Sequence, residues 1–290
     1  MSGYLTTKEL AELLRIGERK VYDLAASGEV PCVRALGKLL FPRADITAWL
    51  AASRSGPEVA DPPLPDIVAG SHDPLLDWAL RESGSGLASV YDGSHDGLAR
   101  LAGRQAQAVG LHIREAEGFN VSALRDAVGE APVVLVEIAR RRRGLLLAPG
   151  VTGIAGFADL RGRRVVLRQD SSASLREFDR QLSEAGLSRE DIDALPARAR
   201  TEEDLAATLR DGKAEAGFGL GALSGAYGLG IAPLWDERFD LAVWRRAWFE
   251  PPMQRLTRFL ASAACASRAS DLGGYDLSGL GTVHHNGASG

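Results

Sequence analysis

Two short polar segments of the same type carry residues of this sequence that could do chemistry. Gly70-Ser71-His72-Asp73 and Gly93-Ser94-His95-Asp96 lie 23 residues apart, and each follows an apolar run that predicts a strand. A third predicted strand ends at His112. Ligands of open α/β folds bind beyond the carboxyl ends of strands. A serine at the start of the next helix adds its hydroxyl to free backbone N–H groups, a combination that favours an anion.

A third polar segment, residues 168–174, again leads from an apolar strand into a helix. Its hydroxyls, on Ser171, Ser172 and Ser174, are predicted to face the same cleft from a second lobe. Two lobes that close around a ligand are a recurrent arrangement. A serine before a helix is also a common N-cap, so a purely structural role stays open for each serine taken alone.

Three histidines at predicted strand ends, His72, His95 and His112, could instead hold a metal ion with Asp73 and Asp96. We do not expect a metal, because histidines that form an apparent cluster in a sequence usually have unrelated roles. A metal-dependent enzyme that uses this cluster remains a minor alternative.

No catalytic motif is present. The sequence has no G-x-S-x-G elbow, no glycine-rich phosphate loop with lysine and no H-E-x-x-H. Ser71, His72 and Asp73 are chain neighbours whose side chains point apart, so they do not form a triad. We therefore predict a protein that is not an enzyme and that has no cofactor.

The run Arg140-Arg141-Arg142-Arg143 directly follows an apolar stretch, residues 132–138, that predicts a strand. We interpret it as a solvated crossing between two lobes rather than as a nucleic-acid patch.

The first fifty residues predict a winged helix-turn-helix. Thr6 and Glu9 form a capping-box pattern for a first helix, and a second helix begins near Glu18. Residues 30–41 predict a hairpin with a glycine turn, and Pro42 suits the first turn of a third helix. Two short helices and a hairpin in this order are typical of that motif.

The second helix of such a motif enters the major groove of DNA. The residues predicted to contact DNA are Glu18, Arg19, Lys20 and Tyr22 on this helix, with Arg34, Lys38 and Arg43 in or after the hairpin. Arg19 can donate two hydrogen bonds to a guanine, whereas Lys20 suits a phosphate. Residues 1–50 hold 7 Lys or Arg and 6 Asp or Glu, about +1, so DNA affinity should need two such domains on one site. We therefore expect a homodimer on double-stranded DNA.

Composition divides the rest of the chain. We expect the DNA-binding domain over residues 1–51, a linker rich in Ala, Ser, Pro and Gly over 52–64, a ligand-sensing α/β domain over 65–266 and a flexible tail over 267–290. Strand candidates alternate with helical stretches in the third part, which predicts parallel sheets covered by helices. His284 and His285 fall in the predicted tail and are expected to be incidental.

Composition also excludes whole classes of protein. A chain that is 45% hydrophobic and 25% charged is too apolar for wholesale disorder. Two cysteines, Cys32 and Cys265, suggest no disulfide framework, and no apolar run is long enough to span a membrane. The N-terminus has no secretion signal, so we expect a cytoplasmic protein.

The first unit resembles the excisionase/MerR-type DNA-binding domain. The residues that carry the resemblance are Thr6 to Leu14, Val21-Tyr22 and Phe41 to Leu50. The remainder, from about Leu64 to Ala264, resembles the periplasmic-binding-protein-like domain that is fused to such units in bacterial regulators. Its supporting segments include the two Gly-Ser-His-Asp segments, Gly212 to Gly219 and Glu237 to Leu241.

This resemblance implies a type II binding-protein fold similar to molybdate- and tungstate-binding proteins. Those proteins hold a tetrahedral oxyanion with hydroxyls and backbone N–H groups of both lobes. Carried over by position, Ser71 and Ser94 would come from the first lobe, and Ser172 and Thr201 from the second. The sequence departs from the molybdate binders at Phe218-Gly219-Leu220, where they place a tyrosine after a late strand.

We therefore predict an α/β protein with an N-terminal winged helix-turn-helix and a two-lobed binding domain, which acts as a one-component transcription regulator. Its partners would be DNA and a small ligand, with an oxyanion such as molybdate or tungstate as one candidate. An excisionase-like architectural protein, whose large domain makes only protein contacts, is the main alternative.

Overall fold

The computed structural model describes residues 3–35, 37–53, 62–170 and 172–287. The chain divides into two compact units, Met1–Pro62 and Pro63–Gly290.

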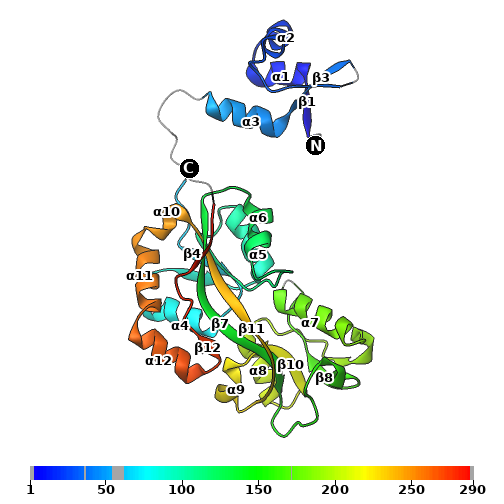
Figure 1. The fold of residues 1–290 in the computed structure, drawn as a ribbon, viewed down its shortest axis with the longest axis vertical. Coiled ribbons are helices and arrows are strands. Elements are labelled where there is room, and N and C mark those ends of the chain that lie inside the picture. Colours follow the sequence, from blue (N-terminus) through cyan, green and yellow to red (C-terminus); the bar gives the residue numbers. More distant parts are fainter. Residues whose placement is uncertain (1–2, 36, 54–61, 171, 288–290) are drawn as a thin grey trace. The chain divides into compact units, whose positions relative to one another are not determined.

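The first unit is built from three helices and a small antiparallel sheet (Figure 1). Its elements are β1 (Tyr4–Thr6), α1 (Thr7–Leu14), α2 (Glu18–Ser27), β2 (Val33–Ala35), β3 (Lys38–Pro42) and α3 (Arg43–Ala52). The strands are ordered β1-β3-β2. β2 and β3 thus form the predicted hairpin, and the third helix begins directly after Pro42.

Local signals set the ends of these helices. Thr6 and Glu9 form the predicted capping box of α1, and Arg15 ends that helix in the left-handed conformation at φ 53°. Gly28 ends α2 at φ 74°. Buried apolar side chains from every helix meet in one core, which includes Leu10, Val21 and Ile46.

The second unit is organised around one mixed sheet with strand order β5-β4-β6-β11-β7-β10-β8-β9. The strands are β4 (Ile67–Gly70), β5 (Ala88–Val90), β6 (Ala108–Leu111), β7 (Val133–Leu147), β8 (Arg164–Val166), β9 (Asp193–Ala194), β10 (Ala216–Leu220) and β11 (Gly230–Trp244). The outer pairs are parallel, as predicted, whereas β6–β11, β11–β7 and β7–β10 are antiparallel. The sheet is therefore mixed rather than parallel throughout.

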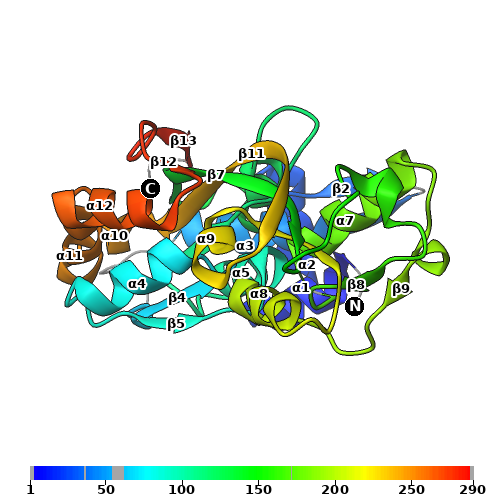
Figure 2. The ribbon, with the colours of Figure 1, turned by 90° about the horizontal axis from the view of Figure 1, so that it is seen from below.

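Two lobes share this sheet, because β7 and β11 are each 15 residues long and cross from one lobe to the other (Figure 2). The first lobe holds β4–β6 with α4 (Pro74–Glu82), α5 (Ser94–Ala102), α6 (Val121–Val128), α10 (Arg245–Trp248), α11 (Pro251–Leu260) and α12 (Ala263–Leu272). The second lobe holds β8–β10 with α7 (Ala173–Glu184), α8 (Glu202–Arg210), α9 (Ala222–Tyr227) and the 3₁₀ turns η1 (Phe157–Leu160) and η2 (Arg189–Asp191).

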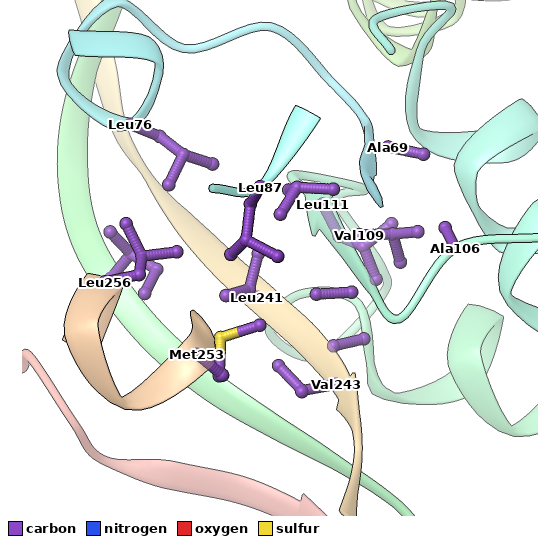
Figure 3. Packing of buried hydrophobic residues seen from close by; sticks show 14 of the residues in the cluster. Ala69, Leu76, Leu87, Ala106, Val109, Leu111, Leu241, Val243, Met253 and Leu256 are labelled. Atoms are coloured by element: carbon purple, nitrogen blue, oxygen red, sulfur yellow. The ribbon is translucent and has the colours of Figure 1, made fainter. Parts of the chain in front are cut away.

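The core of the first lobe packs the apolar faces of α4 and α11 against the sheet (Figure 3). Leu76 and Leu256 lie on the two helices, and Leu111 and Leu241 come from neighbouring strands. The second lobe has one apolar cluster with α7 and another with α8.

The prediction of a flexible tail over residues 267–290 is wrong for the part that the structure describes. α12 continues to Leu272, and β12 (Tyr275–Asp276) and β13 (Val283–Asn286) pair with β7. Glycine content suggested disorder, but the long β7 offers a free edge here whose backbone groups these residues satisfy. His284 and His285 are consequently not incidental: His284 Nε2 lies 2.7 Å from Glu137 Oε2, and His285 is buried.

Candidate functional site

The first unit presents its predicted DNA-binding side chains to solvent. Glu18, Arg19, Lys20 and Tyr22 are exposed on α2, whose other face packs Val21 into the core. Arg34, Lys38 and Arg43 are also exposed. The Arg34 guanidinium reaches back to the Ala25 carbonyl oxygen at 3.4 Å, which ties the hairpin to the end of α2. All seven side chains predicted to contact DNA are therefore accessible on the first unit.

A cleft of about 270 Å³ lies between the two lobes of the second unit. His95, His112, Ile113 and Arg114 line it from the first lobe. The second lobe contributes one face of α7, with Ala173, Ser174, Arg176, Glu177 and Arg180. The remaining lining residues are Arg143, Phe218, Trp235 and Glu237 on β7, β10 and β11.

Among the described residues, two arginine–carboxylate ion pairs and one histidine–carboxylate contact join the lobes around this cleft. Arg114 lies 3.3 Å from Glu177, and Arg200 lies 3.4 Å from Asp92. His72 Nδ1 lies 3.1 Å from the Glu203 carboxylate. Each pair links a residue of the first lobe to one of the second, so the structure shows the lobes in contact.

Beneath the cleft lies a buried network of opposite charges. Arg141 Nη1 donates to Asp73 at 2.8 Å, and Arg141 also contacts Glu237. Arg143 donates to Glu202 at 3.0 Å and to Ser174 Oγ at 2.7 Å. A third guanidinium, Arg168, donates to the same Glu202 oxygen at 2.5 Å. Three arginines and the three carboxylates of Asp73, Glu202 and Glu237 therefore balance one another in formal charge.

The prediction that residues 140–143 form a solvated crossing is half wrong. They do lie on a strand that crosses between lobes, but side chains of a strand alternate between its two faces. Arg140 and Arg142 are 58% and 54% exposed, whereas Arg141 and Arg143 are 2% and 0% exposed. A charge run in a strand is thus divided by the pleat into a solvated half and a buried half.

The arginines of this network favour the ionised forms of its carboxylates. Burial disfavours the ionised form of Glu202, but Arg143 and Arg168 outweigh it and lower the pKa of that carboxyl to about 2. Burial is likewise outweighed at Glu237, whose pKa lies well below its ordinary value because of Arg143, His112 and Arg141. Burial lowers the pKa of His112, although Glu237 opposes this at 3.2 Å. Burial therefore disfavours a charge on His112, whereas the arginines favour the charged forms of both carboxylates.

The structure brings the two predicted serines of the first lobe together. Ser71 Oγ and Ser94 Oγ lie 2.6 Å apart, and the His112 backbone N–H donates to Ser94 Oγ at 3.3 Å. Neither serine is a helix cap: Asp73 caps α4 and Gly93 precedes α5. Both hydroxyls are buried, and neither serine is among the residues that line the cleft.

Glycines make this close approach of the serines possible. A Cβ on Gly97 would lie 2.6 Å from the Gly70 Cα, and a Cβ on Gly70 would lie 2.5 Å from the Gly110 carbonyl oxygen. Gly70 also has φ +101°, a conformation that side chains disfavour. β4, β6 and α5 can therefore touch backbone to backbone, which sets Ser71 against Ser94.

The other predicted ligand residues are dispersed. Ser174 lines the cleft, whereas Ser172 and Thr201 act as N-caps of α7 and α8. Ser171 lies outside the described residues. Of the predicted histidines, His95 and His112 line the cleft, but His72 packs edge-on against the Tyr91 ring and faces Glu203.

No group of three or more His, Cys, Asp or Glu side chains with a metal-holding arrangement occurs within residues 3–35, 37–53, 62–170 and 172–287. His72 and His95, the histidines of the two Gly-Ser-His-Asp segments, therefore do not belong to such a group in the described structure.

Sequence reasoning missed the residues that make the charge network, namely Arg141, Arg143, Arg168, Glu202 and Glu237. One signal was available: arginines two apart in a strand that continues an apolar run share a face. Their partners lie 59 to 96 residues away along the chain and follow no local pattern.

Comparison with known proteins agrees with this geometry. The family described as "PBP superfamily domain" matches residues 78–261, more than half of the chain. The chain belongs to the PBP superfamily. A family described as "Helix-turn-helix domain" matches residues 4–54, so the prediction of a helix-turn-helix fused to a periplasmic-binding-protein-like domain is confirmed.

Individual relatives are distant. The uncharacterized protein YvgK of Bacillus subtilis (strain 168) is 23% identical over 299 residues, which cover 96% of this PBP-superfamily chain and 96% of YvgK. A Clostridium perfringens structure, described as a phosphate ABC transporter substrate-binding protein with bound phosphate, aligns with TM-score 0.53 at 10% identity. That alignment covers 74% of this chain and 98% of the other. An ABC-type phosphate transport receptor from Vibrio cholerae aligns with TM-score 0.47 at 13% identity, over 72% and 98% of the two chains.

The family match and the alignment with the Clostridium perfringens structure establish a mixed α/β fold of the periplasmic-binding type for the second unit. Helices long and apolar enough to cross a membrane are absent from the part of the chain that the structure describes.

Proposed function

We propose that this protein is a DNA-binding transcription regulator whose PBP-like domain senses a small anionic ligand in the inter-lobe cleft. The observation that carries the proposal is the union in one chain of a helix-turn-helix with an exposed α2 and a binding-protein domain with a lined cleft. Both families bind rather than catalyse, so no reaction is assigned to the site.

An anion is the ligand class that the cleft lining supports. Four arginines line the cleft, Arg114, Arg143, Arg176 and Arg180, against the carboxylates of Glu177 and Glu237. Guanidinium groups bind phosphate, molybdate and carboxylate with charge-assisted hydrogen bonds. Molybdate and tungstate, which the resemblance of the sequence implies, and phosphate, which the Clostridium perfringens structure holds, are the first anions to test.

Closure of the lobes around a ligand would couple ligand binding to DNA binding. A ligand that touches both lobes stabilises their contact, and it shifts the population only by its difference in affinity for the two states. In a homodimer, this change would alter the spacing of two helix-turn-helix units and hence their fit to two half-sites. This function places the protein in the cytoplasm, where DNA is accessible.

The test begins with full-length protein and a random duplex library, from which bound DNA is selected. Arg19→Ala should then weaken binding to the selected site by about 1–3 kcal/mol, roughly five- to 150-fold, and relax its sequence preference. Lys8→Ala removes the same charge from α1 and should weaken all sequences alike. Molybdate, tungstate and phosphate are next added to the wild-type complex, where a sensed anion changes the DNA affinity. Absence of any selected sequence, or an unchanged preference in Arg19→Ala, contradicts the proposed role of α2.

A further inference from the structure

The cleft is larger than an inorganic oxyanion requires. Its volume of about 270 Å³ corresponds to roughly nine water molecules at about 30 Å³ each. A tetrahedral oxyanion displaces only a few of these waters. Most of the space would stay filled with water around a molybdate or phosphate, which leaves the lobes few direct contacts through such a ligand.

Aromatic side chains form part of the cleft wall. Phe218 and Trp235 have ring centroids 5.4 Å apart, and Ile113 lies on the opposite lobe. One face of each ring is covered by a guanidinium: Arg143 lies 4.5 Å from the Phe218 centroid, and Arg114 lies 4.9 Å from the Trp235 centroid. The ring surface that remains offers an inorganic oxyanion no hydrogen bond in exchange for its lost hydration. A flat apolar group instead gains by leaving water against this surface.

The arginines that line the cleft differ in how far other residues already engage them. Arg143 already donates hydrogen bonds to Glu202 and Ser174. Arg114 and Arg180 both form ion pairs with Glu177. Arg176 forms no ion pair with another described residue, although it lines the cleft from α7. The buried Arg143 Nε donates no hydrogen bond to another described residue, although Glu237 Oε2 lies 3.6 Å from it. The Glu237 carboxylate, which also lines the cleft, repels an anion that fills the whole cleft.

We infer that the ligand is a small organic anion: one phosphate, phosphonate, sulfonate or carboxylate group joined to an aromatic or similarly flat apolar part. The anionic group lies between Arg176 and Arg143, and the apolar part lies against Phe218 and Trp235. This inference rests on the proposed function, since it takes the inter-lobe cleft to be the sensing site.

The test is calorimetric titration of the full-length protein with phosphate, methylphosphonate, phenylphosphonate and molybdate at one pH. Phenylphosphonate should bind at least tenfold more tightly than methylphosphonate, because only its ring reaches the aromatic wall. Trp235→Leu should remove most of that ratio. Trp248→Leu, a control on α10 outside the cleft, should leave the ratio unchanged. Arg176→Gln should weaken the three phosphorus anions together.

Two failures are distinguishable. If phosphate or molybdate binds as tightly as phenylphosphonate, or if Trp235→Leu leaves the ratio intact, the organic-anion inference is overturned and anion sensing stands. If none of the four anions binds, both the inference and the proposed anion sensor are overturned.

Discussion

Replacing Arg141 by Met should destabilise the PBP-like unit strongly, whereas the same change at the next residue should not. Arg141 is 2% exposed and contacts the carboxylates of Asp73 and Glu237. Its guanidinium also lies 4.1 Å from the centroid of the Phe239 ring. Arg142 is 54% exposed, and its guanidinium pairs with Asp236, itself 57% exposed, at 3.3 Å.

The expected loss of stability follows from the buried carboxylates that Arg141→Met leaves without their arginine. Two charges about 4 Å apart attract by about 4 kcal/mol at an effective dielectric constant near 20, but burying them costs a comparable amount. Arg141→Met removes the attraction and keeps the buried carboxylates. Asp73 retains hydrogen bonds from the Tyr275 hydroxyl and the Leu76 N–H, at 2.8 and 2.7 Å. We therefore expect a loss of about 3–5 kcal/mol, against less than about 1 kcal/mol for Arg142→Met.

Thermal unfolding followed by tryptophan fluorescence measures this difference. In a Trp49→Phe background the four remaining tryptophans all lie in residues 63–290, so the signal reports on the PBP-like unit alone. The Tm should fall by about 6–20 °C for Arg141→Met and by less than about 4 °C for Arg142→Met. Adding Asp73→Asn to Arg141→Met should recover part of the loss, since one uncompensated charge disappears. Equal effects of the two arginine substitutions would refute the division of this strand into buried and solvated faces.

Two further predictions concern the pKa of His112 and the glycine contact beside Ser94. Burial holds the pKa of His112 below its ordinary value of 6.5, so the unfolded chain binds more protons below that pH. The free energy of unfolding should therefore fall as pH drops from about 6.5, by up to about 1.4 kcal/mol per pH unit. The fall should be less steep in His112→Asn. Identical pH profiles of the two proteins would exclude His112 as the source. Gly97→Ala places a Cβ 2.6 Å from the Gly70 Cα and should lower stability by about 1–3 kcal/mol. Gly225→Ala, in open space on α9, should instead be neutral or stabilising by up to about 1 kcal/mol in the same denaturant titration; a Gly97→Ala protein as stable as the wild type would contradict the contact.

Features of the first unit could be predicted because their causes are local. The Thr6–Glu9 capping box spans four residues, and Gly37 turns the hairpin at φ 73° between two adjacent strands. The alternation of strands and helices in the second unit, and the pairing of Ser71 with Ser94 in one place, also followed from short segments that end neighbouring strands. Glycine content wrongly predicted a flexible tail over residues 267–287, because the edge of β7 orders this segment.

The sequence by itself determined the helix-turn-helix and the α/β character of the second unit, and of its predicted ligand residues His95, His112 and Ser174 line the cleft. Only the tertiary structure decided which charges are buried. Arg143 meets Glu202 across 59 residues, and Arg141 meets Glu237 across 96. Those contacts exist because two long strands carry both lobes, and the pleat of β7 turns alternate arginines inward. Burial and pairing of charges depend on long-range packing, which no local pattern of residues encodes.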